Sequence, residues 1–113
     1  MHEYSIVQAL IALVEAQAAE RGATRVHALR VGLGELAGVE PSLLATAFET
    51  FRERTICAGA DLDLRRIPAQ WSCPRCALEI VRGARLQCSG CGGPARLVQG
   101  DELVLESIDL EVN

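Results

Sequence analysis

The sequence predicts an α+β fold of two helices and three strands, interrupted near its end by a small cysteine-rich insertion. Apolar residues recur with helical spacing in two segments and alternate with polar residues in three others. Four of the five cysteines fall within residues 71–99, which separate the last alternating segment from the rest of the chain. A chain of 113 residues is long enough for one compact unit with such an insertion.

The first two predicted elements are a helix over residues 4–21 and a strand over residues 25–36. The helix follows from its apolar spacing and from Gly22, which favours a stop. Its expected buried stripe is Ile6, Leu10, Leu13, Val14 and Ala18. The expected buried face of the strand is Leu29, Val31 and Leu33. Gly32 and Gly34 indicate close packing or a bulge, because a phosphate loop would need a third glycine and a following helix.

Three further elements follow: a helix over residues 41–54, a strand over 60–68 and a last strand over 102–112. Pro41 suits the first helical turn, where its missing N–H is not needed. The apolar stripe expected on this helix is Leu43, Leu44, Ala47, Phe48 and Phe51. In the first of the two strands, one face is expected to carry Leu62, Leu64 and Arg66. In the last strand, strict alternation sets Leu103, Leu105, Ser107, Asp109 and Glu111 against Val104, Glu106, Ile108, Leu110 and Val112.

Composition and charge argue against several kinds of function. The formal net charge of -4 disfavours a phosphate-binding surface, so neither a nucleic acid nor a membrane is expected as a partner. The absence of lysine excludes a phosphate loop of the GK[ST] type and a Schiff-base enzyme. No apolar stretch reaches the roughly 18 residues that a membrane-spanning helix needs. We therefore expect a cytoplasmic protein, in which cysteines serve as metal ligands rather than disulfides.

The four clustered cysteines have the spacing C-x2-C-x11-C-x2-C: Cys73, Cys76, Cys88 and Cys91. Each tight pair can aim two sulfurs at one ion, and the longer spacer allows a short hairpin that brings the pairs together. Four thiolates favour structural Zn(II), with iron in the same ligand set, a redox dithiol and disulfides as the alternatives. The sequence thus divides into a body, residues 1–70 with 100–113, and a zinc-binding module, residues 71–99. Cys57 is expected to be a small buried hydrophobic residue.

The chain begins Met-His-Glu, and a histidine at position 2 has chemistry that an internal histidine lacks. The Met1 amine, the deprotonated His2 amide nitrogen and the His2 imidazole can close adjacent chelate rings on one ion. Ni(II) and Cu(II) favour such nitrogen-rich sets, and Glu3 can add an oxygen. The alternative is a solvated helix start in which Glu3 favours the dipole of the first turn. The residues alone leave both open.

Four stretches follow one another along the chain: MHEYSIVQAL, GLGELAGVEPSLL, AFETFRERT and the paired C-x2-C. Together they resemble the HypA/HybF family. Its members are nickel metallochaperones for the maturation of [NiFe]-hydrogenase and, in some organisms, of urease. The combination of an MHE start with two C-x2-C pairs at this distance is specific to that family.

The resemblance implies two helices packed on a three-stranded mixed sheet, with a zinc-ribbon-like module appended. It implies nickel ligation by the Met1 amine and His2, with Glu3 assisting. Some members also use an acidic residue at the start of the second helix, which here is Glu40, where some relatives carry aspartate. The implied zinc ligands are Cys73, Cys76, Cys88 and Cys91. The implied partners are a HypB-like GTPase, the [NiFe]-hydrogenase large subunit and, for urease, a urease accessory protein.

Three functions compete on these grounds. The first is a carrier without enzymatic activity that takes up nickel at its terminus and delivers it with the GTPase. The second is a zinc-ribbon module that binds protein or nucleic acid and has an incidental MHE start. The third is a redox or hydrolytic enzyme, against which stands the lack of a Cys–His pair, a Ser–His–acid set or an open three-ligand zinc site. The nickel carrier is the function that the sequence favours.

Overall fold

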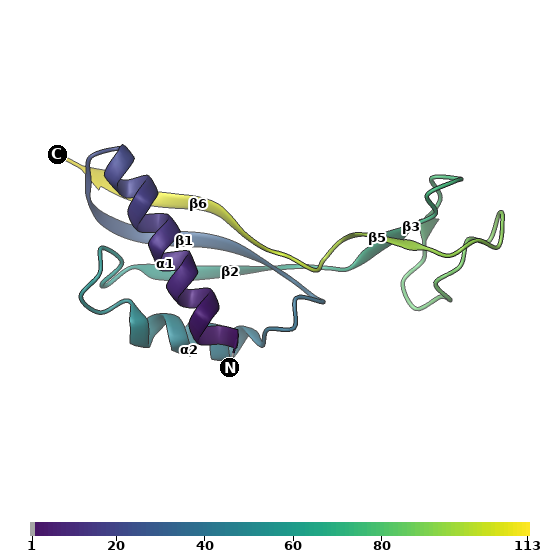
Figure 1. Ribbon diagram of the computed structural model, residues 1–113, viewed down its shortest axis with the longest axis horizontal. Coiled ribbons are helices and arrows are strands. Elements are labelled where there is room, and N and C mark those ends of the chain that lie inside the picture. The colour runs from purple at the N-terminus through teal and green to yellow at the C-terminus, as the bar shows by residue number, and fades with distance from the viewer. Residues whose placement is uncertain (1) are drawn as a thin grey trace.

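The computed structural model describes residues 2–113. Only the backbone of His2 is described, and Met1 lies outside the described residues. The elements are α1 (His2–Glu20), β1 (Ala23–Gly34), α2 (Pro41–Phe51), β2 (Asp61–Ile67), β3 (Gln70–Ser72), β4 (Glu79–Ile80), β5 (Arg96–Gln99) and β6 (Leu103–Val112). The molecule is elongated, 57 × 28 × 17 Å. Both helices lie at one end of its long axis, and the four-cysteine region forms the other end (Figure 1).

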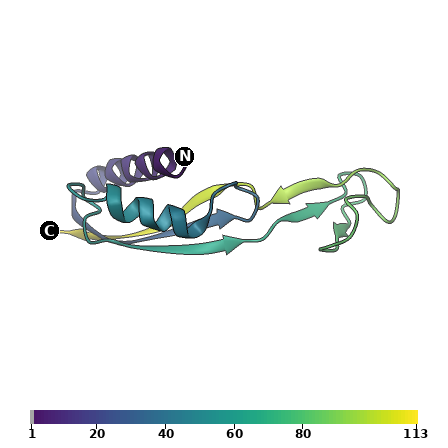
Figure 2. The ribbon, with the colours of Figure 1, turned by 90° about the horizontal axis from the view of Figure 1, so that it is seen from below.

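The larger sheet has the strand order β2-β1-β6. β1 and β2 run parallel, which requires the crossover that α2 provides between them. β6 returns from the cysteine region and pairs antiparallel with β1. α1 and α2 cover the same face of this sheet (Figure 2). The predicted α+β fold, with two helices on a mixed three-stranded sheet, is therefore confirmed.

The hydrophobic core lies between this sheet and the two helices. Its buried members are Val7, Leu10, Ile11, Val14, Val26, Leu29, Val31, Leu33, Leu44, Ala47, Phe48, Cys57 and Ala60. Cys57 is fully buried, as predicted, and burial raises the pKa of its thiol. The prediction of a buried side chain was wrong at two positions: Leu13 is 46% exposed and Leu43 is 54% exposed. Apolar residues occupy most sides of α1, so their spacing does not select the buried face; packing on the sheet selects Val7 and Ile11 instead.

α2 ends at Phe51, three residues before the predicted end. The Thr55 N–H donates to the Arg52 carbonyl in a tight turn, and Arg54 adopts a left-handed φ of 64°. A helix cannot continue through such a residue, which local sequence preferences did not reveal.

β6 carries a bulge that the prediction of strict alternation missed. Arg30 lies opposite Ser107, whereas the next residue, Val31, lies opposite Leu105, so Glu106 is the extra residue. A bulge of this kind reverses the alternation along the strand. As a result, the residues packed against the core come from both predicted faces: Leu103, Leu105, Ile108 and Leu110.

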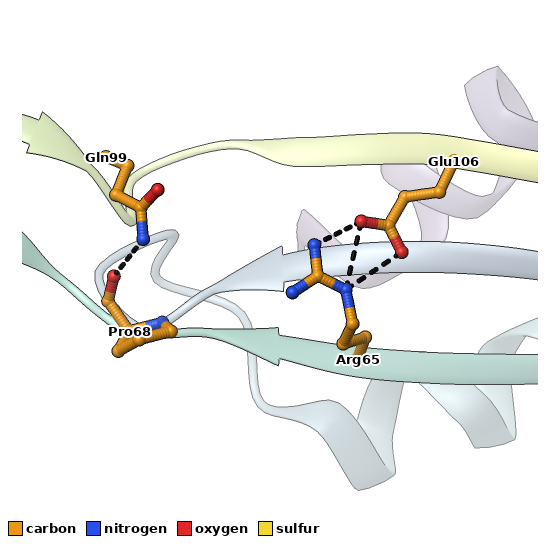
Figure 3. A network of polar contacts seen from close by, with 4 residues as sticks. All are labelled: Arg65, Pro68, Gln99 and Glu106. Carbon is orange, nitrogen blue, oxygen red and sulfur yellow. Dashed lines mark hydrogen bonds and ion pairs between the residues drawn. The ribbon is translucent and has the colours of Figure 1, made fainter.

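Gly32 allows an ion pair to pass over the central strand. Arg65 on β2 binds Glu106 on β6, and both side chains reach across β1 (Figure 3). A Cβ on Gly32 would lie 2.6 Å from Ile67 Cδ1 and 3.1 Å from Glu106 Oε2. This is the close packing that the sequence indicated at Gly32.

A second glycine contact joins the sheet to the cysteine region. β3, β4 and β5 form a small antiparallel sheet of order β4-β3-β5. Residues 68–69 and 100–102 connect it to the larger sheet. A Cβ on Gly34 would lie 2.4 Å from the Gly100 carbonyl oxygen, and a Cβ on Gly100 would lie 2.5 Å from Ala69 Cα. Three backbone segments therefore meet here without side chains between them. The Gln99 amide also donates to the Pro68 carbonyl, at 3.2 Å, and ties the two connections together (Figure 3).

We expect Gly34→Ala to destabilise the protein by about 3 kcal/mol, because the obstacle is backbone and cannot rotate away. Urea unfolding of the metal-loaded protein, followed by far-UV circular dichroism, measures this. Gly38→Ala is the matched control. Gly38 has a left-handed φ of 76° but open space around its Cβ, so it should lose only about 1 kcal/mol. Equal losses in the two variants would contradict a steric role for Gly34.

Candidate metal centres

The predicted nickel ligands Met1 and the His2 side chain lie outside the described residues. The described residues begin with α1, which starts at His2 and has Glu3 in its first turn. Tyr4, one residue further on, packs edge-on against Phe51 at the end of α2, with ring centroids 5.1 Å apart. The first turn of α1 is therefore anchored on α2.

The segment leading to α2 lies beside the same end of α1. Ser5 and Ile6 line one shallow hollow together with Ala37, Gly38 and Val39. Both ribbon views place the N-terminal end of α1 near α2 (Figures 1 and 2). Two segments that are more than 30 residues apart in the chain thus meet at the end of the helix where the terminal amine is attached.

Glu40 is the N-cap of α2, with extended backbone at φ -83° and ψ 123°. Its Oε2 accepts the Leu43 N–H at 3.1 Å and the Ser42 hydroxyl. These two hydrogen bonds hold the pKa of the Glu40 carboxyl below its usual value, and the bond from the Ser42 hydroxyl has the larger effect. Because both fall on Oε2, the other oxygen can approach a cation while the helix cap stays in place.

The four cysteines form one cluster at the far end of the molecule. Their sulfurs all lie within 4.8 Å of one another, and Cys73 Sγ lies 3.6 Å from Cys91 Sγ. A tetrahedral Zn(II) site with Zn–S bonds of about 2.3 Å needs sulfurs about 3.8 Å apart. The donor set and its spacing therefore fit a four-thiolate zinc site. Cys73 and Cys88 are buried, whereas Cys76 and Cys91 are exposed.

The two C-x2-C pairs fold into near-identical turns. In the first, the Ala77 N–H donates to the Cys73 carbonyl at 2.9 Å; in the second, the Gly92 N–H donates to the Cys88 carbonyl at 2.8 Å. Backbone N–H groups also point at sulfur, from Cys76 to Cys73 Sγ and from Gly90 to Cys88 Sγ. Such bonds stabilise thiolate, which is the form that binds metal.

The residue after each pair is left-handed, with φ of 57° at Ala77 and 73° at Gly92. We expect Gly92→Ala to cost about 1 kcal/mol, or about fivefold in zinc affinity, from backbone conformation alone, since no atom lies near its Cβ. Ala77→Gly should gain a similar amount, because glycine adopts this conformation without strain. Competition with a chromophoric chelator measures both. A loss of affinity in Ala77→Gly would contradict the assignment of a strained turn.

Hydrogen bonds within the cluster shift the pKa values of Cys73 and Cys76 in opposite directions. The N–H of Cys76 lowers the pKa of Cys73 to about 7, whereas hydrogen bonds with the thiols of Cys91 and Cys88 raise the pKa of Cys76 to about 12. A bound dication must displace the remaining protons, so metal affinity should rise with pH.

Among the side chains from Glu3 onward, the other candidate ligands do not gather into a site. His27 Nε2 lies 2.8 Å from Glu111 Oε1 on the exposed face of the sheet, and both side chains are about half exposed. Within the side chains that the structure describes, the four cysteines are the one group of three or more histidine, cysteine or acidic residues arranged for a metal.

Comparison with known proteins agrees with this architecture. Residues 1–110 match the family model described as "Hydrogenase/urease nickel incorporation, metallochaperone, hypA". The chain belongs to the HypA family. It is 38% identical to the hydrogenase maturation factor HypA of Aquifex aeolicus, over all of both chains. It is 40% identical to that of Wolinella succinogenes, over 98% of this chain and 96% of the relative.

Solved HypA structures have the same fold. The Ni metallochaperone HypA from Helicobacter pylori aligns with a TM-score of 0.77 and 33% identity, over 98% of each chain. A second HypA solution structure aligns with a TM-score of 0.82 and 34% identity, over 100% of this chain and 98% of the other. The resemblance seen in the sequence is thus confirmed: the protein is a member of a family of nickel metallochaperones for hydrogenase maturation. In the described residues, none of the helices has the length and apolarity that a membrane span requires.

Proposed function

We propose that this HypA protein binds Ni(II) at its N-terminus and delivers it, with a HypB-like GTPase, to the [NiFe]-hydrogenase large subunit in the cytoplasm. The ligands are the Met1 amine and the His2 amide and imidazole nitrogens, with Glu3 and Glu40 as oxygen donors. In this proposal residues 1–70 with 100–113 form the nickel-binding body, and residues 71–99 form a structural Zn(II) module. The observation that supports it most is the family match, which begins at residue 1 and includes the MHE start.

The start of α1 suits a cation that must be released. The first N–H groups of a helix have no partner within the helix, so the His2 amide can release its proton to water and bind a metal in its place without breaking α1. The positive end of the helix dipole opposes a bare cation there, while the anionic amide and the Glu3 carboxylate offset this effect. We therefore expect micromolar affinity, since each 1.4 kcal/mol of extra binding slows release about tenfold at similar on-rates.

The test is calorimetric titration of nickel into the zinc-loaded protein with its native, untagged terminus. The comparison is a variant with Gly-Ser-Gly-Ser placed before Met1, which separates the terminal amine from His2, puts no histidine at the third position and leaves every side chain present. Micromolar binding in the first and none in the second is the expected result. Equal binding in both would remove the terminus from the mechanism, and no binding in either would leave a zinc-ribbon protein without a nickel function.

Delivery is tested separately. The nickel-loaded protein is mixed with the GTPase and with a nickel-free hydrogenase large subunit, and nickel in the large subunit is measured after separation. Because the family description names urease as well as hydrogenase, nickel-free urease with its accessory protein is tested in parallel. Transfer that is equally fast from free nickel would argue against a carrier role.

A further inference from the structure

Glu35 lies where the body and the four-cysteine module meet. It directly follows β1, and its side chain is only 18% exposed. Its Oε1 accepts the Ala69 N–H of one connection and the Arg82 Nη1 of the module, each at 2.9 Å. Arg82 Nη2 binds the second oxygen. A single carboxylate of the body thus holds both a connecting segment and a module side chain.

The backbone of the same segment binds both connections. The Glu35 N–H donates to the Ile67 carbonyl at 2.8 Å, just before the first connection. The Leu36 N–H donates to the Gly100 carbonyl in the second connection at 2.6 Å. Four residues after Leu36, the chain reaches Glu40, the N-cap of α2, and residues 37–39 on the way line a hollow with Ser5 and Ile6 of α1. The segment from Glu35 to Glu40 therefore runs from the module junction to the proposed nickel site.

Beside these close backbone contacts, the side chains of the junction leave open space. An open groove of about 400 Å³ separates the body from the module, with Leu36 on one side and Trp71, Ile80 and Leu86 on the other. Apolar side chains that line an open groove do not fix an orientation as a filled core does. The bidentate Arg82–Glu35 pair has the geometry that makes an ion pair directional.

We propose that Glu35 is a positioning residue for nickel transfer: through Arg82 it holds the four-cysteine module in one orientation relative to the helices. The module and the nickel-binding end then face a partner protein as one rigid surface. The transfer step rests on the proposed function, whereas the orientation itself does not depend on nickel.

The proposal is tested on nickel-free, zinc-loaded, ¹⁵N-labelled protein. Residual dipolar couplings are measured for β1, β2 and β6 of the body and for residues 71–99. In the native protein one alignment tensor should fit both sets. In Glu35→Gln, which keeps an acceptor for the Ala69 N–H but loses the charge, the module couplings should shrink and lose the shared tensor. Arg82→Gln should do the same, and since Arg82 is 68% exposed it should not disturb folding.

The double variant shows whether Glu35 and Arg82 orient the module as one ion pair or act independently of each other. If Glu35 and Arg82 act as one pair, Glu35→Gln combined with Arg82→Gln should be no worse than either alone. Arg85→Gln is the matched control, because this exposed module arginine lies in the same loop, and it should keep the shared tensor. A shared tensor in Glu35→Gln, or additive effects in the double variant, would overturn the proposal.

The transfer step has its own readout. Glu35→Gln should keep the native nickel affinity but deliver nickel more slowly to the hydrogenase large subunit in the presence of the GTPase. Native transfer rates from a variant with a demonstrably loose module would overturn the role in transfer. If the native protein itself binds no nickel, the proposed function fails, and the couplings still decide whether Glu35 orients the module.

Discussion

His2→Ala should abolish nickel binding and leave the fold intact. The substitution removes the imidazole and with it two of the chelate's advantages, a strong nitrogen donor and a second ring. A site of micromolar strength should weaken at least about a thousandfold, or about 4 kcal/mol, and leave the range of calorimetry. Alanine favours helix, and the core contacts of α1 begin further along the chain, at Ile6 and Val7. Unchanged circular dichroism and unchanged zinc content would show that the fold is retained.

His27→Ala is the matched control for that experiment. His27 is the chain's other histidine, and it is paired with Glu111 on the open sheet face, far along β1 from the junction. Its loss should leave nickel affinity unchanged. Retained nickel binding in His2→Ala together with a loss in His27→Ala would transfer the site to the sheet and end the terminal-chelate proposal.

Cys73→Ser should release zinc and unfold residues 71–99 while the body remains folded. The strands of this region are two to four residues long, and of its residues only Cys73 and Cys88 are among the buried hydrophobic ones, so little apolar area stabilises it. In small zinc domains the metal supplies about 10–16 kcal/mol of apparent binding free energy, which is also folding free energy. Zinc analysis and the collapse of amide shift dispersion in this region measure the effect.

Cys57→Ala is the matched control for the cysteine experiment, because Cys57 lies in the core of the body rather than in the cluster. It should lose some stability but keep a full equivalent of zinc. A strong chelator added to the native protein should reproduce the Cys73→Ser spectrum. An intact, zinc-loaded module in Cys73→Ser would refute the zinc assignment.

The elements of the fold could be predicted because their signals are local. The alternation of Leu29, Val31 and Leu33 and the proline at position 41 each act within a few residues of chain. The exact buried face of α1 could not be predicted from the sequence. Apolar residues of α1 lie on most sides of the helix, so the sheet beneath it decides which side is buried. The bulge at Glu106 was hidden for a related reason: it is a property of the pairing between β6 and β1 and not of β6 itself.

For the metal centres, the sequence predicted the cysteine cluster but not the arrangement around Glu40. The spacing of the cysteines was enough to expect one cluster, because two tight turns joined by a short hairpin leave little freedom. By contrast, the helix cap made by Glu40, and the approach of the segment before it to Ser5 and Ile6 of α1, depend on tertiary packing. Side-chain chemistry marks a candidate, but only packing brings candidates from distant segments together.

Four thiols at C-x2-C spacing and a histidine next to the terminal amine are chemical facts of the chain, and they point to metal before any folding is considered. The ion pair between Glu35 and Arg82, by contrast, is decided by the tertiary structure. These residues are 47 positions apart, and nothing near either of them in the chain marks it as a partner of the other. They meet because the two segments that connect the body to the module pass beside Gly34. There the backbone of Gly100 comes too close to Gly34 to leave room for a side chain. Local chemistry is encoded residue by residue, whereas the relation between the two ends of this molecule is a product of the packing at that junction.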